Sequence, residues 1–190
     1  MIYPKKSLGQ NFLRDKNIVK KIINLIDVSS NKFIEIGPGY GTLTNEIIKL
    51  RPKEFIIIEK DADLYNFLKI QIKDKKILIL NKDALKYDYS NLSDYTIVSN
   101  LPYNISSKFL LKTIKLNQNI NNIFCMIQSE LADKFDYNKG KMNKYKFVAK
   151  YCGTYEILFE VPPTVFFPKP KVKSKVVKFI LTKKHINVKK

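Results

Sequence analysis

The chain has 190 residues, of which 45% are hydrophobic and 12% aromatic, so whole-chain disorder is excluded and one domain with a sizeable core is expected. Its 35 Lys and Arg residues against 17 Asp and Glu give a formal charge of +18, which favours a polyanionic partner, nucleic acid before an anionic membrane surface. Cys125 and Cys152 form no Cys-x-x-Cys pair and His185 has no partners at ligand spacing, which argues against a disulfide framework and a metal site.

The N-terminus and the apolar runs contain no targeting or membrane signal. No run approaches the roughly 20 residues of a membrane helix, and the first residues lead into Gly9-Gln10-Asn11 rather than a hydrophobic core. We therefore expect a cytoplasmic monomer. Lys, Asn and Ile recur along the whole chain, as AT-rich coding would produce without selection for binding, but nine lysines between 169 and 190 stand almost unopposed by acids.

Helix and strand signals alternate through the first hundred residues. Asp15 is placed to cap a helix with apolar residues at helical spacing, namely Ile18, Val19, Ile22, Ile23 and Ile26. Short apolar runs follow at 33–36, 55–58, 77–80 and 96–98, and the segments between them, notably 42–50 and 61–72, are typical of helices. This alternation predicts a parallel sheet with helical crossovers.

The remaining chain continues the sheet with a changed rhythm. A fifth strand at 123–127 precedes an amphipathic stretch at 130–135 and a polar loop at 137–144. Two further strand candidates, 156–161 and 175–181, flank a stiff Pro-rich segment and are expected to join the sheet edge as a hairpin-like addition. The sequence thus predicts an α/β fold with a seven-stranded, mostly parallel sheet, an antiparallel edge strand and helices on both faces.

A glycine-rich turn lies between the first strand and the next helix, in the sequence Glu35-Ile36-Gly37-Pro38-Gly39-Tyr40-Gly41-Thr42. About 22 residues after Gly37 the second strand ends at Glu59, whose carboxylate can accept both hydroxyl protons of a ribose. The Gly-x-Gly-x-Gly spacing does not by itself call for a pyrophosphate, which favours S-adenosylmethionine over NAD. Asp83, beyond the third strand, could accept from an adenine amino group. Each residue alone would most often be an ordinary surface residue, but the combination predicts an adenosine site.

The tetrapeptide Asn100-Leu101-Pro102-Tyr103 follows the fourth strand and resembles the Asn/Asp-Pro-Pro-Tyr motif of amino-group methyltransferases. The amino nitrogen of adenine is a poor nucleophile because its lone pair is delocalised into the ring. The Asn100 side-chain oxygen and the backbone carbonyl of Leu101 or Pro102 can each accept one N–H and draw the nitrogen toward tetrahedral geometry. Tyr103 would stack on the extruded base, and no general base is required.

Three segments together resemble the ribosomal RNA adenine-N6,N6-dimethyltransferase family over nearly the whole chain: Ser7–Leu13, Asn100–Ser106 and Val161–Ser174. The resemblance implies a Rossmann-like class I methyltransferase fold, S-adenosylmethionine as cofactor and ribosomal RNA as partner. It implies that Phe166 sandwiches the target adenine against Tyr103. The implied cofactor-binding residues are Gln10, Asn11, Leu13, Gly37, Gly39, Glu59, Lys60, Asp83, Ala84 and Asn100.

The motifs look more like the branch of the family that dimethylates two adjacent adenines near the 3′ end of small-subunit rRNA. The large-subunit branch of the macrolide-resistance type, a non-catalytic assembly factor and a small-molecule methyltransferase stay open as alternatives. Gln128-Ser129-Glu130 and Met142–Lys146 depart from the family pattern near the expected substrate face. We expect residues 1–182 to form the catalytic domain, 1–14 to contact cofactor and RNA, 183–190 to be a basic tail, and the family's C-terminal helical domain to be missing.

Overall fold

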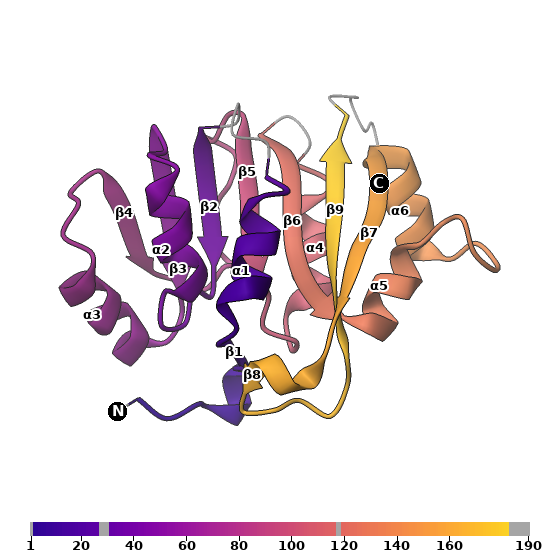
Figure 1. The fold of residues 1–190 in the computed structure, drawn as a ribbon. Helices are drawn as coiled ribbons and strands as arrows, with labels where there is room; N and C mark the ends of the chain where they lie inside the picture. Colours follow the sequence, from indigo (N-terminus) through magenta and orange to yellow (C-terminus); the bar gives the residue numbers. More distant parts are fainter. Residues whose placement is uncertain (1, 27–30, 117–118, 183–190) are drawn as a thin grey trace.

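A seven-stranded sheet forms the centre of the computed structural model, which describes residues 2–26, 31–116 and 119–182 (Figure 1). The strand order is β4-β3-β2-β5-β6-β9-β7, with β2 (Lys32–Ile36), β3 (Glu54–Glu59), β4 (Ile77–Asn81), β5 (Tyr95–Asn100), β6 (Ile120–Gln128), β7 (Gly153–Val161) and β9 (Ser174–Leu181). The five neighbouring strands β4, β3, β2, β5 and β6 are parallel to one another, whereas β9 runs antiparallel to both of its neighbours, β6 and β7. The mostly parallel seven-stranded sheet is confirmed, and the antiparallel strand β9 lies one place in from the edge, which β7 occupies.

Helices cover both faces of this sheet. One face packs against α1 (Lys16–Ile23), α2 (Thr42–Lys49) and α3 (Ala62–Gln71), and the other against α4 (Ser106–Thr113), α5 (Ser129–Phe135) and α6 (Lys144–Cys152). Successive residues of a strand point to opposite faces, and β2 follows this rule. Phe33 belongs to the core cluster under α1 and α2, whereas Ile34 and Ile36 belong to the cluster under α4 to α6.

The N-terminal segment crosses below the main sheet and forms a small second sheet. Strand β1 (Phe12–Leu13) pairs antiparallel with β8 (Phe166–Phe167), so that two segments distant in sequence lie side by side near the carboxyl ends of the parallel strands (Figure 1). A 3₁₀ turn (Lys6–Leu8) precedes β1, and another (Pro163–Val165) precedes β8. The predicted helix cap is confirmed, because the Asp15 carboxylate accepts from the N–H groups of Asn17 at 2.7 Å and Ile18 at 3.1 Å.

Some expectations fall outside the part of the chain that is described. The basic tail at 183–190, with His185, is among these residues. Across the described ranges, no helix is both long and apolar enough to cross a membrane.

Candidate active site

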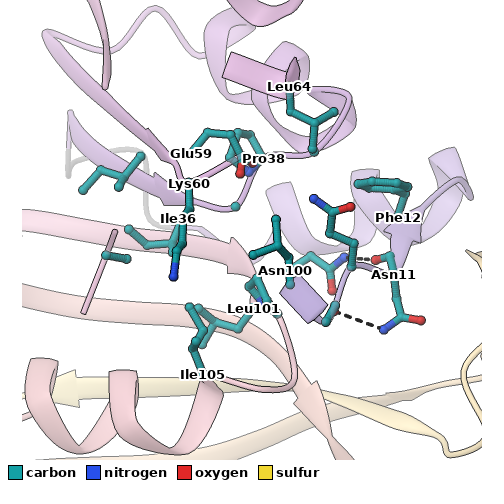
Figure 2. A pocket seen from close by; sticks show the side chains of 18 of the residues that line it. Asn11, Phe12, Ile36, Pro38, Glu59, Lys60, Leu64, Asn100, Leu101 and Ile105 are labelled. Carbon is teal, nitrogen blue, oxygen red and sulfur yellow. Dashed lines mark hydrogen bonds between the residues drawn. The ribbon is translucent and has the colours of Figure 1, made fainter. Parts of the chain in front are cut away.

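A cavity lies at the carboxyl ends of the four adjacent strands β4, β3, β2 and β5 (Figure 2). Because chain connections leave β2 in one direction to β3 and β4, while β5 lies on its other side, the cavity opens at the point where ligands bind in open parallel sheets. It encloses about 1020 Å³ of space, open solvent at its mouth included.

The glycine turn forms the floor of this cavity, and its conformation requires glycine. Gly37 and Gly39 have φ angles of 61° and 60°, in the left-handed region that other residues rarely adopt. A Cβ atom at Gly37 would lie 3.1 Å from the Pro102 ring, and one at Gly39 would lie 2.7 Å from the Phe12 ring. The turn therefore lies directly under the predicted base motif and the N-terminal segment.

Glu59 is the last residue of β3 and lines the cavity. The residue is only 5% exposed. Its Oε1 accepts from the Asp61 N–H at 2.8 Å. Burial raises the pKa of Glu59 to about 7, although N–H groups of Asp61, Gly39 and Lys60 lower it. A ligand that donates hydrogen bonds to this buried carboxyl group would stabilise its ionised form and lower its pKa.

Asp83 and Ala84 line the cavity beyond β4, and Lys60 lines it beyond β3. Asp83 Oδ2 pairs with Lys60 Nζ at 3.0 Å, and its Oδ1 accepts from the Leu85 N–H at 2.9 Å. Burial raises the pKa of Asp83, but the Lys60 ammonium and the Leu85 N–H outweigh it, so the pKa lies below its ordinary value. Asp83 is thus an ionised acceptor, and Lys60 orients it.

Glu35 is a buried acid at the cavity to which the sequence analysis gave no role. Its side chain is on the α2 side of β2, where Oε2 accepts from Thr44 Oγ1 at 2.6 Å. Burial raises the pKa of Glu35 to about 8, the Thr44 hydroxyl lowers it, and nearby Glu59 raises it. The glycine turn is therefore backed by two acids that titrate near neutral pH.

The N-terminal segment closes the cavity from the outside and is tied to α3. Both ends of the Gln10 side-chain amide are bonded within the protein. Its Nε2 donates to Asp61 Oδ2 at 2.9 Å, and its Oε1 accepts from the Lys5 N–H at 2.6 Å. Lys5 Nζ lies 2.7 Å from both Asp61 Oδ1 and Asp63 Oδ2. Asp61, whose side chain is fully buried, thus anchors residues 5–10, which we call the strap.

Asn100 ends β5 at the cavity and contacts the strap's continuation (Figure 2). Its Nδ2 donates to the Asn11 backbone carbonyl at 2.8 Å. The Asn11 side chain turns back and donates to the Gly9 carbonyl at 3.3 Å. Leu13 is 5% exposed, lines the cavity and also belongs to the hydrophobic core cluster under α1 and α2. The amide nitrogen of Asn100 is therefore engaged within the protein, while its Oδ1 accepts no hydrogen bond from the residues described.

Tyr103 lines the same cavity and is half-buried. Its hydroxyl lies 2.6 Å from Ser174 Oγ, at the first residue of β9. Burial raises the pKa of Tyr103 and the Ser174 contact lowers it, with the net value above the ordinary one. Ser174, which is fully buried, therefore fixes the orientation of a neutral Tyr103 ring.

Phe166 is the one predicted site residue that the structure does not bring to the cavity lining. Its ring is 4% exposed and belongs to the core cluster that contains Leu13 and Val161. Because neighbouring strand residues alternate in direction, Phe167 takes the exposed position of β8. A sandwich of a base between Tyr103 and Phe166 would require the Phe166 ring to leave this cluster.

Four residues that contact or orient residues of the cavity lining had no role predicted from the sequence: Lys5, Glu35, Asp61 and Ser174. A signal existed for Asp61, because an aspartate two residues after a strand end and directly before a helix is typical of a helix cap. Its ties to Lys5 and Gln10 join residues more than fifty positions apart and carry no local signal.

The residues present fit an S-adenosylmethionine-type ligand. The glycine turn leaves no room for side chains, buried Glu59 suits a pair of ribose hydroxyl donors, and ionised Asp83 suits an amino group. Within the described ranges, no group of three His, Cys, Asp or Glu residues could hold a metal ion.

Comparison with known proteins agrees with this geometry. Residues 3–190 match the family model described as ribosomal RNA adenine dimethylase. "Ribosomal RNA small subunit methyltransferase A" of Maridesulfovibrio salexigens is 42% identical over 183 residues, which cover 92% of this chain and 68% of the relative. The protein of the same name from Mycoplasmopsis synoviae is 40% identical over 177 residues, which cover 91% of this chain and 68% of that relative.

Solved structures share the fold. The 23S rRNA methyltransferase ErmE superimposes with a TM-score of 0.80 at 23% identity, over 91% of this chain and 70% of that one. A dimethyladenosine transferase from Plasmodium falciparum gives 0.77 at 24% identity, over 90% of this chain and 63% of that one. By the family match and the curated relatives, the chain belongs to the ribosomal RNA adenine dimethylase family of S-adenosylmethionine-dependent methyltransferases.

Proposed function

We propose that this chain dimethylates N6 of two adjacent adenines near the 3′ end of small-subunit ribosomal RNA and so takes part in small-subunit maturation. Relatives at 40% and 42% identity carry small-subunit names, whereas ErmE is only 23% identical. These values favour the small-subunit branch over the large-subunit one. Residues 1–182 would be the catalytic domain, acting as a monomer in the cytoplasm.

The observation that carries this proposal is the hydrogen bond from Asn100 Nδ2 to the Asn11 carbonyl at 2.8 Å. An amide side chain can present either its oxygen or its nitrogen, and this contact selects the oxygen for the cavity. Oδ1 of Asn100 can then accept one N–H of the target amine. The Asn100 Oδ1 atom favours a base with an amino group over one with a carbonyl at the same position. A carbonyl oxygen facing Oδ1 would leave two acceptors without a donor.

The second acceptor for the amine is the Leu101 carbonyl rather than that of Pro102. The Pro102 carbonyl already accepts from the N–H groups of Ile105 and Ser106, each at 3.1 Å, and from Ser106 Oγ at 2.9 Å. The Leu101 carbonyl receives only a long contact of 3.5 Å from Ser106 Oγ. Accepting both N–H groups draws the nitrogen lone pair out of conjugation and fixes its direction.

Tyr103 supplies the surface for the extruded base, and Ser174 holds the ring in place. When bound, S-adenosylmethionine supplies an electrophilic methyl group on a positively charged sulfur. Glu59 and Asp83 would hold the ribose and the adenine amino group of the bound cofactor, and Asn100 and Leu101 line the same cavity. The methylated amine loses its proton to water, so the cavity requires no general base.

The test incubates the protein and labelled cofactor with small ribosomal subunits whose adenines are unmethylated, and then maps the modified bases. We expect label on N6 of adenine, loss of label in Asn100→Ala, and a sharp reduction in Tyr103→Ala. Asn66→Ala is the matched control, because Asn66 is an exposed amide on α3 outside the cavity lining.

Label that persists in Asn100→Ala would overturn the assigned mechanism. In a parallel incubation with unmethylated large subunits, label on those subunits alone would support the large-subunit alternative. Titration with S-adenosylmethionine separates a third outcome, because a non-catalytic assembly factor would bind subunits without the cofactor.

A further inference from the structure

The two phenylalanines of β8 have opposite environments. Phe166 is 4% exposed, whereas the next residue, Phe167, is 44% exposed. Phe167 is paired in register with Phe12 of β1, and the Arg14 N–H donates to the Val165 carbonyl at 2.9 Å. The exposed ring is therefore held on a small sheet and does not lie on a free loop.

Arg14 completes a flat surface with this ring. Its guanidinium carbon lies 4.0 Å from the centre of the Phe167 ring, a close cation–π contact. Arg14 is exposed and forms no ion pair with any described residue. The carboxylate next to it in sequence, Asp15, is engaged as the cap of α1. The pair thus combines a planar apolar face with a cation that lacks an acidic partner.

The segment that follows β8 extends the positive charge. Lys169 and Lys171 are exposed, and neither has an ion pair among the described residues. Lys173 is also exposed and pairs with Glu160 at 3.3 Å. Residues 162–173 contain three lysines and no acid, so the charge that this segment itself presents is positive.

This surface lies one strand from the catalytic cavity. Phe12 and Leu13 of β1 line the cavity, and β8 lies beside β1 at the same edge of the main sheet (Figure 1). A neighbouring unit of a polymer that places one unit in the cavity is thus within reach of this surface.

We propose that Arg14, Phe167, Lys169 and Lys171 form a docking platform for a nucleotide that flanks the target adenine. The inference rests on the proposed function and names a contact of the RNA outside the cavity. The flanking base stacks on the exposed side of the Arg14–Phe167 pair, and Lys169 and Lys171 contact phosphates. Unpaired cations beside an aromatic ring fit a nucleotide, which offers a π face and an anion within one unit.

The test measures methylation of unmethylated small ribosomal subunits over a range of subunit concentrations. We expect Phe167→Ala to raise KM for subunits about tenfold while kcat and the affinity for S-adenosylhomocysteine stay within twofold of wild type. Phe167→Tyr keeps a ring and should restore KM, whereas Phe167→Leu keeps apolar area without a π face and should not. Arg14→Lys keeps the charge and should fall between wild type and Phe167→Ala.

Phe147→Ala is the matched control, since Phe147 is a 59% exposed phenylalanine on α6, away from β8. A second readout is direct binding of the S-adenosylhomocysteine-saturated protein to subunits, followed by ultraviolet cross-linking to locate the nucleotide at Phe167. The platform is overturned if Phe167→Ala binds subunits like wild type, or if Phe147→Ala weakens binding equally. Because the binding readout needs no turnover, the platform can stand or fall separately from the methyl transfer.

Discussion

Glu59 and Glu35 are held in the protein interior at the end of one parallel strand and inside the next. Burial disfavours the charged form of a carboxyl group, which explains pKa values of about 7 and 8 in place of ordinary values near 4.5. A ligand hydroxyl that donates to Glu59 favours the ionised form, so ligand binding and proton release are coupled.

The first prediction concerns this coupling. We expect the affinity for S-adenosylhomocysteine to increase as the pH rises from 6 to 8, with release of a proton on binding near pH 7. Calorimetry in buffers of different ionisation enthalpy measures both quantities. Glu59→Gln should weaken binding at least tenfold and flatten the pH dependence. An affinity that is independent of pH in the wild type would contradict the assignment of Glu59 as hydroxyl acceptor.

The second prediction concerns stability. A carboxyl whose folded pKa exceeds its unfolded pKa contributes stability below the unfolded value, and this contribution is lost as the pH rises through the folded value. For Glu35 this stabilising contribution is lost as the pH rises from about 4.5 to about 8. Glu35→Gln should therefore match the wild type in free energy of unfolding near pH 5 and exceed it by a few kcal/mol near pH 9, at about 1.36 kcal/mol per pKa unit. Urea unfolding at both pH values provides the measurement, and Glu156→Gln, an exposed glutamate on β7, is the control.

Residues that line the cavity at strand ends could be predicted from the sequence, whereas the residues that fix their orientation could not. Glu59 and Asn100 are the last residues of β3 and β5, Asp83 lies two residues beyond β4, and the ends of parallel strands must meet at one edge. The choice between Phe166 and Phe167 as the exposed ring depends on the register with β1, which no local pattern encodes.

At the scale of elements, the strap is held by contacts with three different parts of the sheet edge. Lys5 and Gln10 reach Asp61 at the start of α3, Ser7 accepts from Asn104 Nδ2 at 3.2 Å, and the Asn11 carbonyl accepts from Asn100. Burial raises the pKa of Asp61, but Lys5 and Gln10 lower it below the ordinary value, so the anchor stays ionised. The strap, with Asn11 after it, therefore connects the buried Asp61 carboxylate to the Asn100 side chain.

The third prediction tests this anchor with Asp61→Asn. Asparagine still caps a helix, so α3 should persist, but it cannot pair with the Lys5 ammonium. We expect affinity for S-adenosylhomocysteine to fall about fivefold and amide hydrogens of residues 5–11 to exchange faster, as hydrogen-exchange mass spectrometry would show. Asp15→Asn is the control, because it makes the same change at the cap of α1. Unchanged exchange of the strap in Asp61→Asn would show that other contacts hold it.

Most elements were predicted because their strands are short, apolar and separated by helices with clear periodicity. Four of the strands and α-helices in the described residues were not predicted, namely the short strands β1 and β8, which pair across the chain, and the helices α4 and α6. The two helices lack clear sequence signals for physical reasons. Helix α4 begins after Ile105, which makes no side-chain capping bond, and its first residues are serines. Helix α6 buries Lys146 as well as Ala149, because the Lys146 ammonium donates to the Lys139 and Lys141 carbonyls. A lysine on the buried face hides the apolar stripe on which prediction from sequence depends.

At the scale of the whole molecule, a charge of +18 accompanies a cavity whose lining contains three acids, Glu35, Glu59 and Asp83, and only two lysines, Lys60 and Lys82. The cationic excess of the chain therefore lies outside this cavity. Binding of RNA by a cationic surface releases counterions, whereas binding of the small cofactor depends on hydrogen bonds inside the cavity. The two affinities should consequently respond differently to salt.

The fourth prediction follows from this difference. We expect affinity for unmethylated small subunits to fall roughly 50- to 150-fold between 50 and 200 mM salt, as neutralisation of about four phosphates would give. Affinity for S-adenosylhomocysteine should change less than about twofold over the same range, because the acid proposed to hold its ribose, Glu59, is buried and salt screens buried groups less. Filter binding and calorimetry measure the two quantities on one preparation. A subunit affinity that hardly changes with salt would mean that shape and base contacts dominate, and that much of the charge reflects composition alone. In that case Lys169→Gln and Lys171→Gln should leave the salt slope unchanged, whereas phosphate contacts predict a slope reduced by about one for each lysine removed.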